Sequence, residues 1–127
     1  MKTLQIEETR SSPKIYFNPQ THIHTISGES YPENTTQFYD PILEWINMYL
    51  TNKHDGTIIF NIELIYFNSS SSKILLDIFD MLDETKNEKI IVNWIHDAED
   101  EAMEEYGEEF KEDIEYIQFN IKKNYTT

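Results

Sequence analysis

Residues 57–73, TIIFNIELIYFNSSSSK, join a long run of β-favouring residues directly to a cluster of serines. In this run one parity, from Ile58 to Tyr66, is wholly apolar, and the other parity includes the polar residues Asn61 and Glu63. Because side chains alternate between the two faces of a strand, the pattern predicts a long central strand with one face in the core and the other partly covered. The serine cluster then lies at a strand-to-helix junction.

The residues on the C-terminal side of the serines alternate between helical and strand patterns. An apolar stripe at steps of three and four predicts a helix from the serines to about Lys86-Asn87, and residues 89–95 form a second buried strand. Apolar residues four apart from Ala98 to Ile114 predict a third amphipathic helix. Alternation over residues 117–121 predicts a final strand.

The residues before the central strand predict a hairpin followed by a helix. Residues 14–17 and 22–26 are β-rich and flank an Asn-Pro turn, and Gly28 is expected to end the hairpin. The helix has two candidate starts: a cap at Asn34 or Thr35 with Pro41 inside, or a cap at Asp40 with Pro41 in the first helical position. We expect a loose first turn and a regular helix over residues 40–50.

Helices that alternate with strands indicate βαβ units. The expected fold class is therefore α/β: a mixed sheet in which an N-terminal antiparallel hairpin joins parallel strands, with about three helices. No linker or internal repeat interrupts residues 1–127, which predicts one domain.

Composition excludes several classes of protein. The net charge of −14 disfavours nucleic acid and anionic membranes as partners, and no apolar run of about 20 residues is present to span a bilayer. The chain lacks cysteine and has no apolar signal region near Met1, so we expect a cytoplasmic protein without disulfides or thiolate metal sites.

Catalytic, metal and cofactor motifs are weak in this sequence. The run from Asp97 to Asp113 holds ten carboxylates, which we interpret as the solvated face of the third helix. His22 and His24 share a strand face, but no nearby residue supplies a third metal ligand. Glycine-rich phosphate loops are also lacking. We expect no enzymatic activity, no metal and no cofactor.

The serine cluster admits three interpretations. One of Asn68, Ser69 or Ser70 is suited to cap the helix, because such side chains accept hydrogen bonds from the free N–H groups of the first turn. One cap leaves the other hydroxyls unexplained, so a second interpretation is a phosphate acceptor that the helix dipole and Lys73 would stabilise. A nucleophilic serine is the third, but the flanking glycines of a nucleophile elbow are missing.

Two segments together resemble the SiaC family of regulatory phosphoproteins. The first is residues 28–34, GESYPEN, followed by Phe38-Tyr39 and Trp45, and the second is residues 66–73, YFNSSSSK. Ser12-Pro13 in the N-terminal arm also fits. The resemblance implies a fold similar to the STAS domains of anti-sigma-factor antagonists, with a phosphorylatable serine or threonine at the start of the helix after a central strand.

In the SiaC family this hydroxyl is controlled by a serine/threonine kinase and a PP2C-type phosphatase. The unphosphorylated form activates a diguanylate cyclase, which connects the switch to cyclic-di-GMP and biofilm formation. The resemblance places the phosphoacceptor on Ser69, with Ser70 as the second choice. Its supporting residues are Asn68, Ser70, Ser71, Ser72 and Lys73, and the loop that forms a candidate partner surface is Ser30, Tyr31, Pro32, Glu33 and Asn34.

The leading hypothesis is therefore a phosphorylation-controlled partner-switching protein of bacterial signalling. A constitutive interaction or scaffold domain, in which the serines only cap the helix, is the first alternative. A small enzyme acting on a soluble metabolite is the second, and it requires a pocket lined by perturbed titratable groups near Ser69.

Overall fold

The computed structural model describes residues 1–125 and contains one mixed sheet of six strands with three helices packed on it. This arrangement confirms the predicted α/β class. The elements follow one another as β1 (Leu4–Ile6), β2 (Lys14–Asn18), β3 (Ile23–Ser30), α1 (Thr35–Thr51), β4 (Ile58–Phe67), α2 (Ser69–Glu84), β5 (Ile90–Asp97), α3 (Glu101–Glu112) and β6 (Gln118–Asn124).

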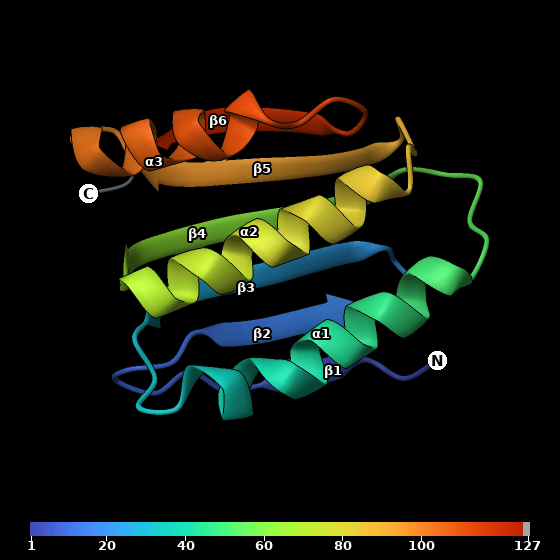
Figure 1. Ribbon diagram of the computed structural model, residues 1–127, viewed down its shortest axis with the longest axis horizontal. Helices are drawn as coiled ribbons and strands as arrows, with labels where there is room; N and C mark the ends of the chain where they lie inside the picture. Colours follow the sequence, from blue (N-terminus) through green and yellow to red (C-terminus); the bar gives the residue numbers. More distant parts are fainter. Residues whose placement is uncertain (126–127) are drawn as a thin grey trace.

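The strands lie in the sheet in the same order as in the chain. The pairs β1–β2 and β2–β3 are antiparallel, whereas the pairs β3–β4, β4–β5 and β5–β6 are parallel. Each parallel connection contains one helix. Because such crossovers share one hand, successive connections between neighbouring strands place all three helices on the same face of the sheet (Figure 1).

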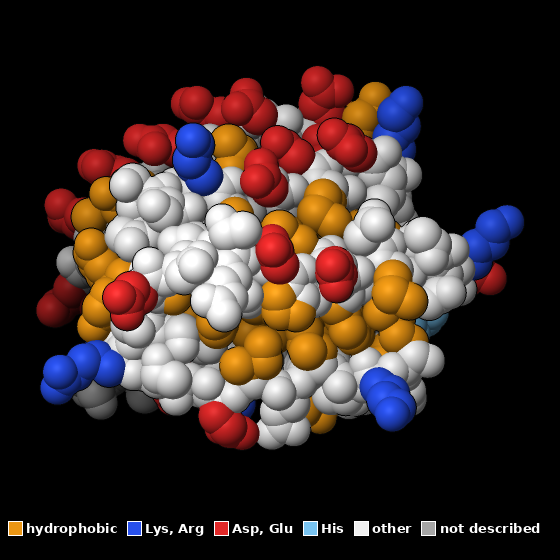
Figure 2. Space-filling model, turned by 60° about the horizontal axis from the view of Figure 1, so that its bottom comes forward, with side chains coloured by type: hydrophobic (Ala, Val, Ile, Leu, Met, Phe, Trp, Pro, Cys, Tyr) orange, Lys and Arg blue, Asp and Glu red, His pale blue; other side chains and the backbone are white. Residues whose placement is uncertain are grey.

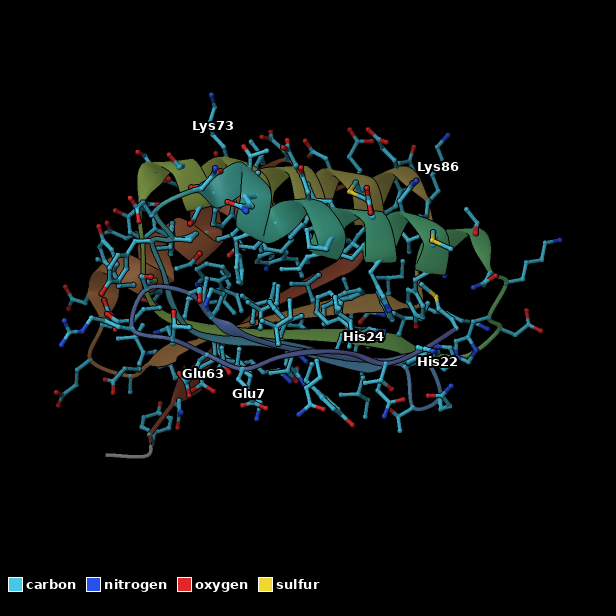
Figure 3. The ribbon with its side chains drawn as sticks, turned by 90° about the horizontal axis from the view of Figure 1, so that it is seen from below. Glu7, His22, His24, Glu63, Lys73 and Lys86 are labelled. Atoms are coloured by element: carbon cyan, nitrogen blue, oxygen red, sulfur yellow. The ribbon has the colours of Figure 1, made fainter. Side chains whose placement is uncertain are left out.

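The core lies between the helices and the sheet. Seen edge-on, the helices form one layer and the strands a second, and no helix of residues 1–125 covers the opposite face of the sheet (Figure 3). The largest fully buried side chains of the core come from both layers: Trp94, Tyr39, Phe17, Phe60, Phe79, Ile15, Ile26, Ile42, Ile46, Ile62, Leu75 and Ile78.

The end of β4 departs from the predicted alternation. The register between β3 and β4 shifts at Gly28/Glu29, so that Ile65 is an extra residue on β4. This bulge reverses the alternation that follows it. Tyr66, expected in the core, is 49% exposed, and Phe67 is buried instead. The bulge thereby sets the direction in which the chain enters α2.

One boundary near α1 agrees with expectation and one differs. The hairpin ends at Gly28 as expected, because β2 pairs with β3 only as far as Ser27, while β3 itself continues to Ser30 in its pairing with β4. The expected regular start at Asp40 was wrong: Asn34 caps the helix and accepts a hydrogen bond from the Gln37 N–H, with Pro41 inside the helix. The cap at Asn34 satisfies a free N–H group, which gives the longer helix an early start.

The third helix is shorter than its apolar spacing suggested. It covers Glu101–Glu112 with Asp100 as its cap, so Ala98 and Ile114 lie outside it. Gly107 allows the helix to approach the sheet, since a Cβ there would lie 2.5 Å from Cδ1 of Trp94. The exposed carboxylates of this helix lie on its solvent side, as the acidic run predicted.

Candidate functional site at the start of the second helix

The start of α2 is capped by an amide rather than by a serine. Asn68 Oδ1 accepts a hydrogen bond of 2.9 Å from the Ser71 N–H, and the Asn68 carbonyl accepts the first intrahelical bond from Ser72. The Asn68 N–H in turn donates to the carbonyl of Ser30 at the end of β3. Capping therefore uses Asn68 and leaves the serine hydroxyls for other roles.

Ser71 belongs to a buried chain of hydroxyls. The Ser30 Oγ lies 2.8 Å from Ser71 Oγ and 2.6 Å from Tyr39 Oη, and all three residues are fully buried. Burial raises the pKa of the Tyr39 phenol. The three hydroxyls therefore stay uncharged and tie the end of β3 to α1 and to α2.

Ser69 and Ser70, in contrast, are both exposed. Within residues 1–125, neither their hydroxyls nor their N–H groups make a hydrogen bond. The first turn of α2 contains no acidic residue, so its positive dipole end is not compensated from within the turn. An exposed hydroxyl thus stands beside free N–H donors at a helix start that favours an anion.

The remaining members of the serine cluster surround this position. Ser72 is half-buried, and Lys73 is exposed. The Lys73 side chain points away from the body of the protein (Figure 3), and it forms no ion pair within residues 1–125. Lys73 is therefore available to an added negative charge one turn before it.

The loop of residues 30–34 divides into a buried and an exposed part. Ser30 lies in the core as part of the hydroxyl chain, behind the surface rather than on it. Tyr31 donates its N–H to the Ser11 carbonyl of the N-terminal arm and packs edge-on against Tyr66. Pro32 is half-buried, while Glu33 and Asn34 are exposed.

An open groove of about 1250 Å³ joins the exposed part of this loop to α2. The start of α1 forms one wall, and the first turns of α2 form the other. The lining residues are Glu33, Asn34, Thr35, Thr36, Gln37, Phe38, Ser70, Lys73, Ile74, Leu76 and Asp77. The structure therefore brings two sequence segments, the loop and the serine cluster, to a single surface.

The groups with the most perturbed pKa values lie at the opposite end of the sheet. Burial, and then the charge of nearby His22, lowers the pKa of His24 to about 4. Burial raises the pKa of Tyr49 to about 12. His22 precedes β3 with a positive φ of 60°, stacks on His54 and contacts the Tyr49 hydroxyl at 2.5 Å. No three metal-ligating side chains gather anywhere in residues 1–125.

Tyr39 is the site residue that sequence reasoning missed. Its position on the apolar stripe of α1 identified a core residue, but the hydroxyl of a buried tyrosine usually needs a hydrogen-bond partner. This need for a partner was the one feature of the sequence that could have identified Tyr39 as part of the site. The partners, Ser30 and Ser71, come from distant parts of the chain and meet only in the folded protein.

Comparison with known proteins shows extensive similarity. A family model described as SiaC family regulatory phosphoprotein matches residues 6–124. An uncharacterized protein of Pseudomonas aeruginosa strain UCBPP-PA14 is 32% identical over 120 residues, which cover 91% of this chain and 93% of the relative.

Solved structures agree with this match. The crystal structure of apo-SiaC from Pseudomonas aeruginosa has a TM-score of 0.87 and 31% identity, covering 96% of this chain and 99% of that one. A chain in the crystal structure of the diguanylate cyclase SiaD in complex with its activator SiaC, from the same organism, has a TM-score of 0.88 and 30% identity. That match covers 95% of this chain and 99% of the other. Within residues 1–125, no helix has the length and apolar character needed to cross a membrane.

Proposed function

Because the chain belongs to the SiaC family of regulatory phosphoproteins, we propose that it is a partner-switching protein controlled by phosphorylation of Ser69. A serine/threonine kinase adds the phosphate in the cytoplasm, a PP2C-type phosphatase removes it, and the unmodified form binds and activates a diguanylate cyclase. SiaC of Pseudomonas aeruginosa, a relative with the same fold, is an activator in complex with the diguanylate cyclase SiaD. That complex supports the choice of partner.

The observation that carries the proposal is the exposed hydroxyl of Ser69 in the first position of α2. Ser71 is fully buried, so its hydroxyl is inaccessible to a kinase. Ser70 is exposed but lines the groove, whereas Ser69 does not. The capping interaction of Asn68 keeps the first turn in place while Ser69 is modified.

A phosphate at Ser69 changes the local charge by about −1.5 to −2. The free N–H groups of the first turn and the ammonium of Lys73 stabilise that charge within this protein. A partner that buries the helix start desolvates the same dianion without supplying a matching cation. Because an unpaired buried charge is strongly unfavourable, the modified form releases the partner.

The groove beside Ser69 is the surface that we assign to the activated partner. Hydrophobic side chains form a band across the helical side of the molecule, below an edge crowded with Asp and Glu (Figure 2). Phe38, Ile74 and Leu76 contribute apolar area to the groove walls. A groove with both polar and apolar walls next to a site of variable charge provides both affinity and a means of release.

Two experiments test the proposal. The first is peptide mass spectrometry on the protein purified from its own host with phosphatases inhibited. We expect phosphate on Ser69, removed by a PP2C-type phosphatase. Phosphate confined to Ser70, or to none of the serines, contradicts the assignment.

The second experiment captures partners from lysate of the same host. Ser69→Ala and Ser69→Asp serve as bait, with Ser69→Asn as the uncharged control of similar shape. Captured material is assayed for conversion of GTP into cyclic-di-GMP. We expect activity with Ser69→Ala and Ser69→Asn, and none with Ser69→Asp. Equal capture by Ser69→Ala and Ser69→Asp would instead support a constitutive scaffold.

A further inference from the structure

The two walls of the groove come from neighbouring helices, α1 and α2, which lie side by side on the sheet (Figure 1). Phe38 lines the groove from α1, and Ser70 lines it from α2. The residues that follow them, Tyr39 and Ser71, are fully buried, and both contact the hydroxyl of Ser30. The hydroxyl chain of Tyr39, Ser30 and Ser71 therefore joins the two walls from within the core.

The hydroxyl chain is the only polar connection between α1 and α2 in residues 1–125. No other hydrogen bond or ion pair connects the two helices there. Apart from this chain the helices meet through packing, which is non-directional and allows crossing angles to vary by about 15–20°. Hydrogen bonds have narrower limits of distance and angle. The hydroxyl chain thus restricts the separation of the groove walls more closely than packing does.

Ser30 anchors the hydroxyl chain to the sheet. It is the last residue of β3, where it pairs with Phe67 at the end of β4. Its carbonyl accepts a hydrogen bond of 3.0 Å from the Asn68 N–H, so the start of α2 is bonded to Ser30 through both backbone and side chain. Among the described residues, α1 is bonded to Ser30 through the Tyr39 hydroxyl alone. Removing that hydroxyl therefore releases α1 and leaves α2 attached.

A partner that contacts both walls binds more tightly when the walls are already held in the bound arrangement, because less conformational freedom is lost on binding. We propose that Tyr39 is a positioning residue for the partner: acting through Ser30 and Ser71, it holds the groove walls at the separation that the activated cyclase recognises. This role rests on the proposed function, which assigns the groove to that partner. Ser69 takes no part in the hydroxyl chain, so its exposure does not depend on Tyr39.

Tyr39→Phe tests the proposal, with Tyr49→Phe as the matched control. Both changes keep a buried ring on α1 and remove a hydroxyl that makes a hydrogen bond, but the Tyr49 hydroxyl contacts His22 at the opposite end of the sheet. Each variant is titrated as bait into lysate of the host, and the captured material is assayed for conversion of GTP into cyclic-di-GMP. We expect Tyr39→Phe to need about tenfold more bait for half-maximal capture than the unmodified protein. Tyr49→Phe should match the unmodified protein within about twofold.

Ser71→Ala and the double variant with Tyr39→Phe separate positioning from a general loss of stability. Either single change breaks the connection between the walls, so the double variant should need no more bait than the weaker single variant, within about twofold. Independent losses would multiply instead. Hydrogen exchange of the free proteins gives a readout without the partner: amides of residues 38–42 and 72–76 should exchange faster in Tyr39→Phe than in Tyr49→Phe.

The unmodified bait distinguishes failure of this inference from failure of the proposed function. If the unmodified protein captures no cyclase activity, the proposed function is contradicted, and the role of Tyr39 falls with it. If it captures activity and Tyr39→Phe captures as well, or Tyr49→Phe loses as much, the positioning role is overturned. Multiplied losses in the double variant, or equal hydrogen exchange in the two phenylalanine variants, also overturn it.

Discussion

At one end of the sheet, where β3 and β4 finish beside α2, a chain of hydroxyls is buried, whereas at the opposite end, where β3 begins, the buried polar groups are imidazoles and a phenol. Ser30, Ser71 and Tyr39 form the first group. His24 and Tyr49 are buried in the second, and His22 lies half-buried beside them (Figure 3).

The difference concerns how each end acquires charge. Hydroxyls of serine and of a buried tyrosine do not ionise at physiological pH, so the chain of Ser30, Ser71 and Tyr39 stays uncharged. Imidazoles change charge when the pH falls, so the opposite end responds to protons. The hydroxyl chain beside the proposed phosphorylation site is therefore insensitive to modest changes in pH.

The largest effect that we predict tests the imidazole end. Lowering the pH from 6.5 to 4 should reduce the free energy of unfolding by about 3 kcal/mol through His24. Burial lowers the pKa of His24 to about 4 in the folded protein. Below pH 6.5 the unfolded chain therefore binds a proton that the folded protein excludes, which favours unfolding.

Urea denaturation of the unmodified protein and of His24→Phe, at several pH values, checks this prediction. Phenylalanine suits the aromatic surroundings that Phe17, Trp45 and Phe60 provide, and it does not titrate. The variant should lose less stability than the unmodified protein between pH 6.5 and 4. If the stabilities of the two proteins changed equally with pH, folding would not lower the pKa of His24, and the prediction would be wrong.

A smaller effect is expected at the hydroxyl end. Ser30→Ala removes the hydroxyl shared by Tyr39 and Ser71, and it should lower the free energy of unfolding by about 2 kcal/mol. Ser70→Ala changes an exposed side chain, so its effect should stay within about 0.5 kcal/mol. Urea denaturation at neutral pH measures both, and equal losses would show that the buried chain adds no stability.

The helix cap gives the next effect. Asn68→Ala should cost about 1 kcal/mol, because the Ser71 N–H loses its acceptor. An amide does not titrate, so this loss should be the same at pH 7 and at pH 5. Thermal or urea denaturation at both pH values provides the measurement. A loss that depends on pH would break the distinction between the two ends.

The smallest effect concerns charge at the first position of α2. Ser69→Asp should raise the free energy of unfolding by about 0.5 kcal/mol, since a carboxylate interacts favourably with the positive end of the helix. Added salt should screen the gain. Ser69→Asn has a similar shape without the charge and serves as the control. A gain of the same size in Ser69→Asn would exclude the dipole as its cause.

Secondary structure was largely predictable from local pattern. The alternation from Ile58 to Leu64, and the apolar stripe from Ile74 to Leu82, are periodic enough to define β4 and α2. The element order then determined the α/β class, because helices between strands favour parallel pairing. The motif at the junction of β4 and α2, which resembles the SiaC family, identifies Ser69 as the candidate phosphoacceptor.

The boundaries were less predictable. The start of α1 depended on a competition between two caps, Asn34 and Asp40, which the local sequence left open. Tyr66 and Phe67 exchanged faces because of a bulge that exists only in the pairing of β4 with β3. A register shift depends on how two distant strands pair, so the alternation of residues within one strand does not reveal it.

Sequence alone thus determined which residues sit at the start of α2, since a strand pattern and a helix pattern meet there. The tertiary structure decided what each serine does. Ser71 meets Ser30 and Tyr39 because β3 ends beside α2 in the folded protein, and this contact withdraws one hydroxyl into the core. Ser69, two residues earlier, takes no part in that contact and remains exposed. Four chemically identical residues acquire different roles through burial, which is a property of the fold rather than of the sequence.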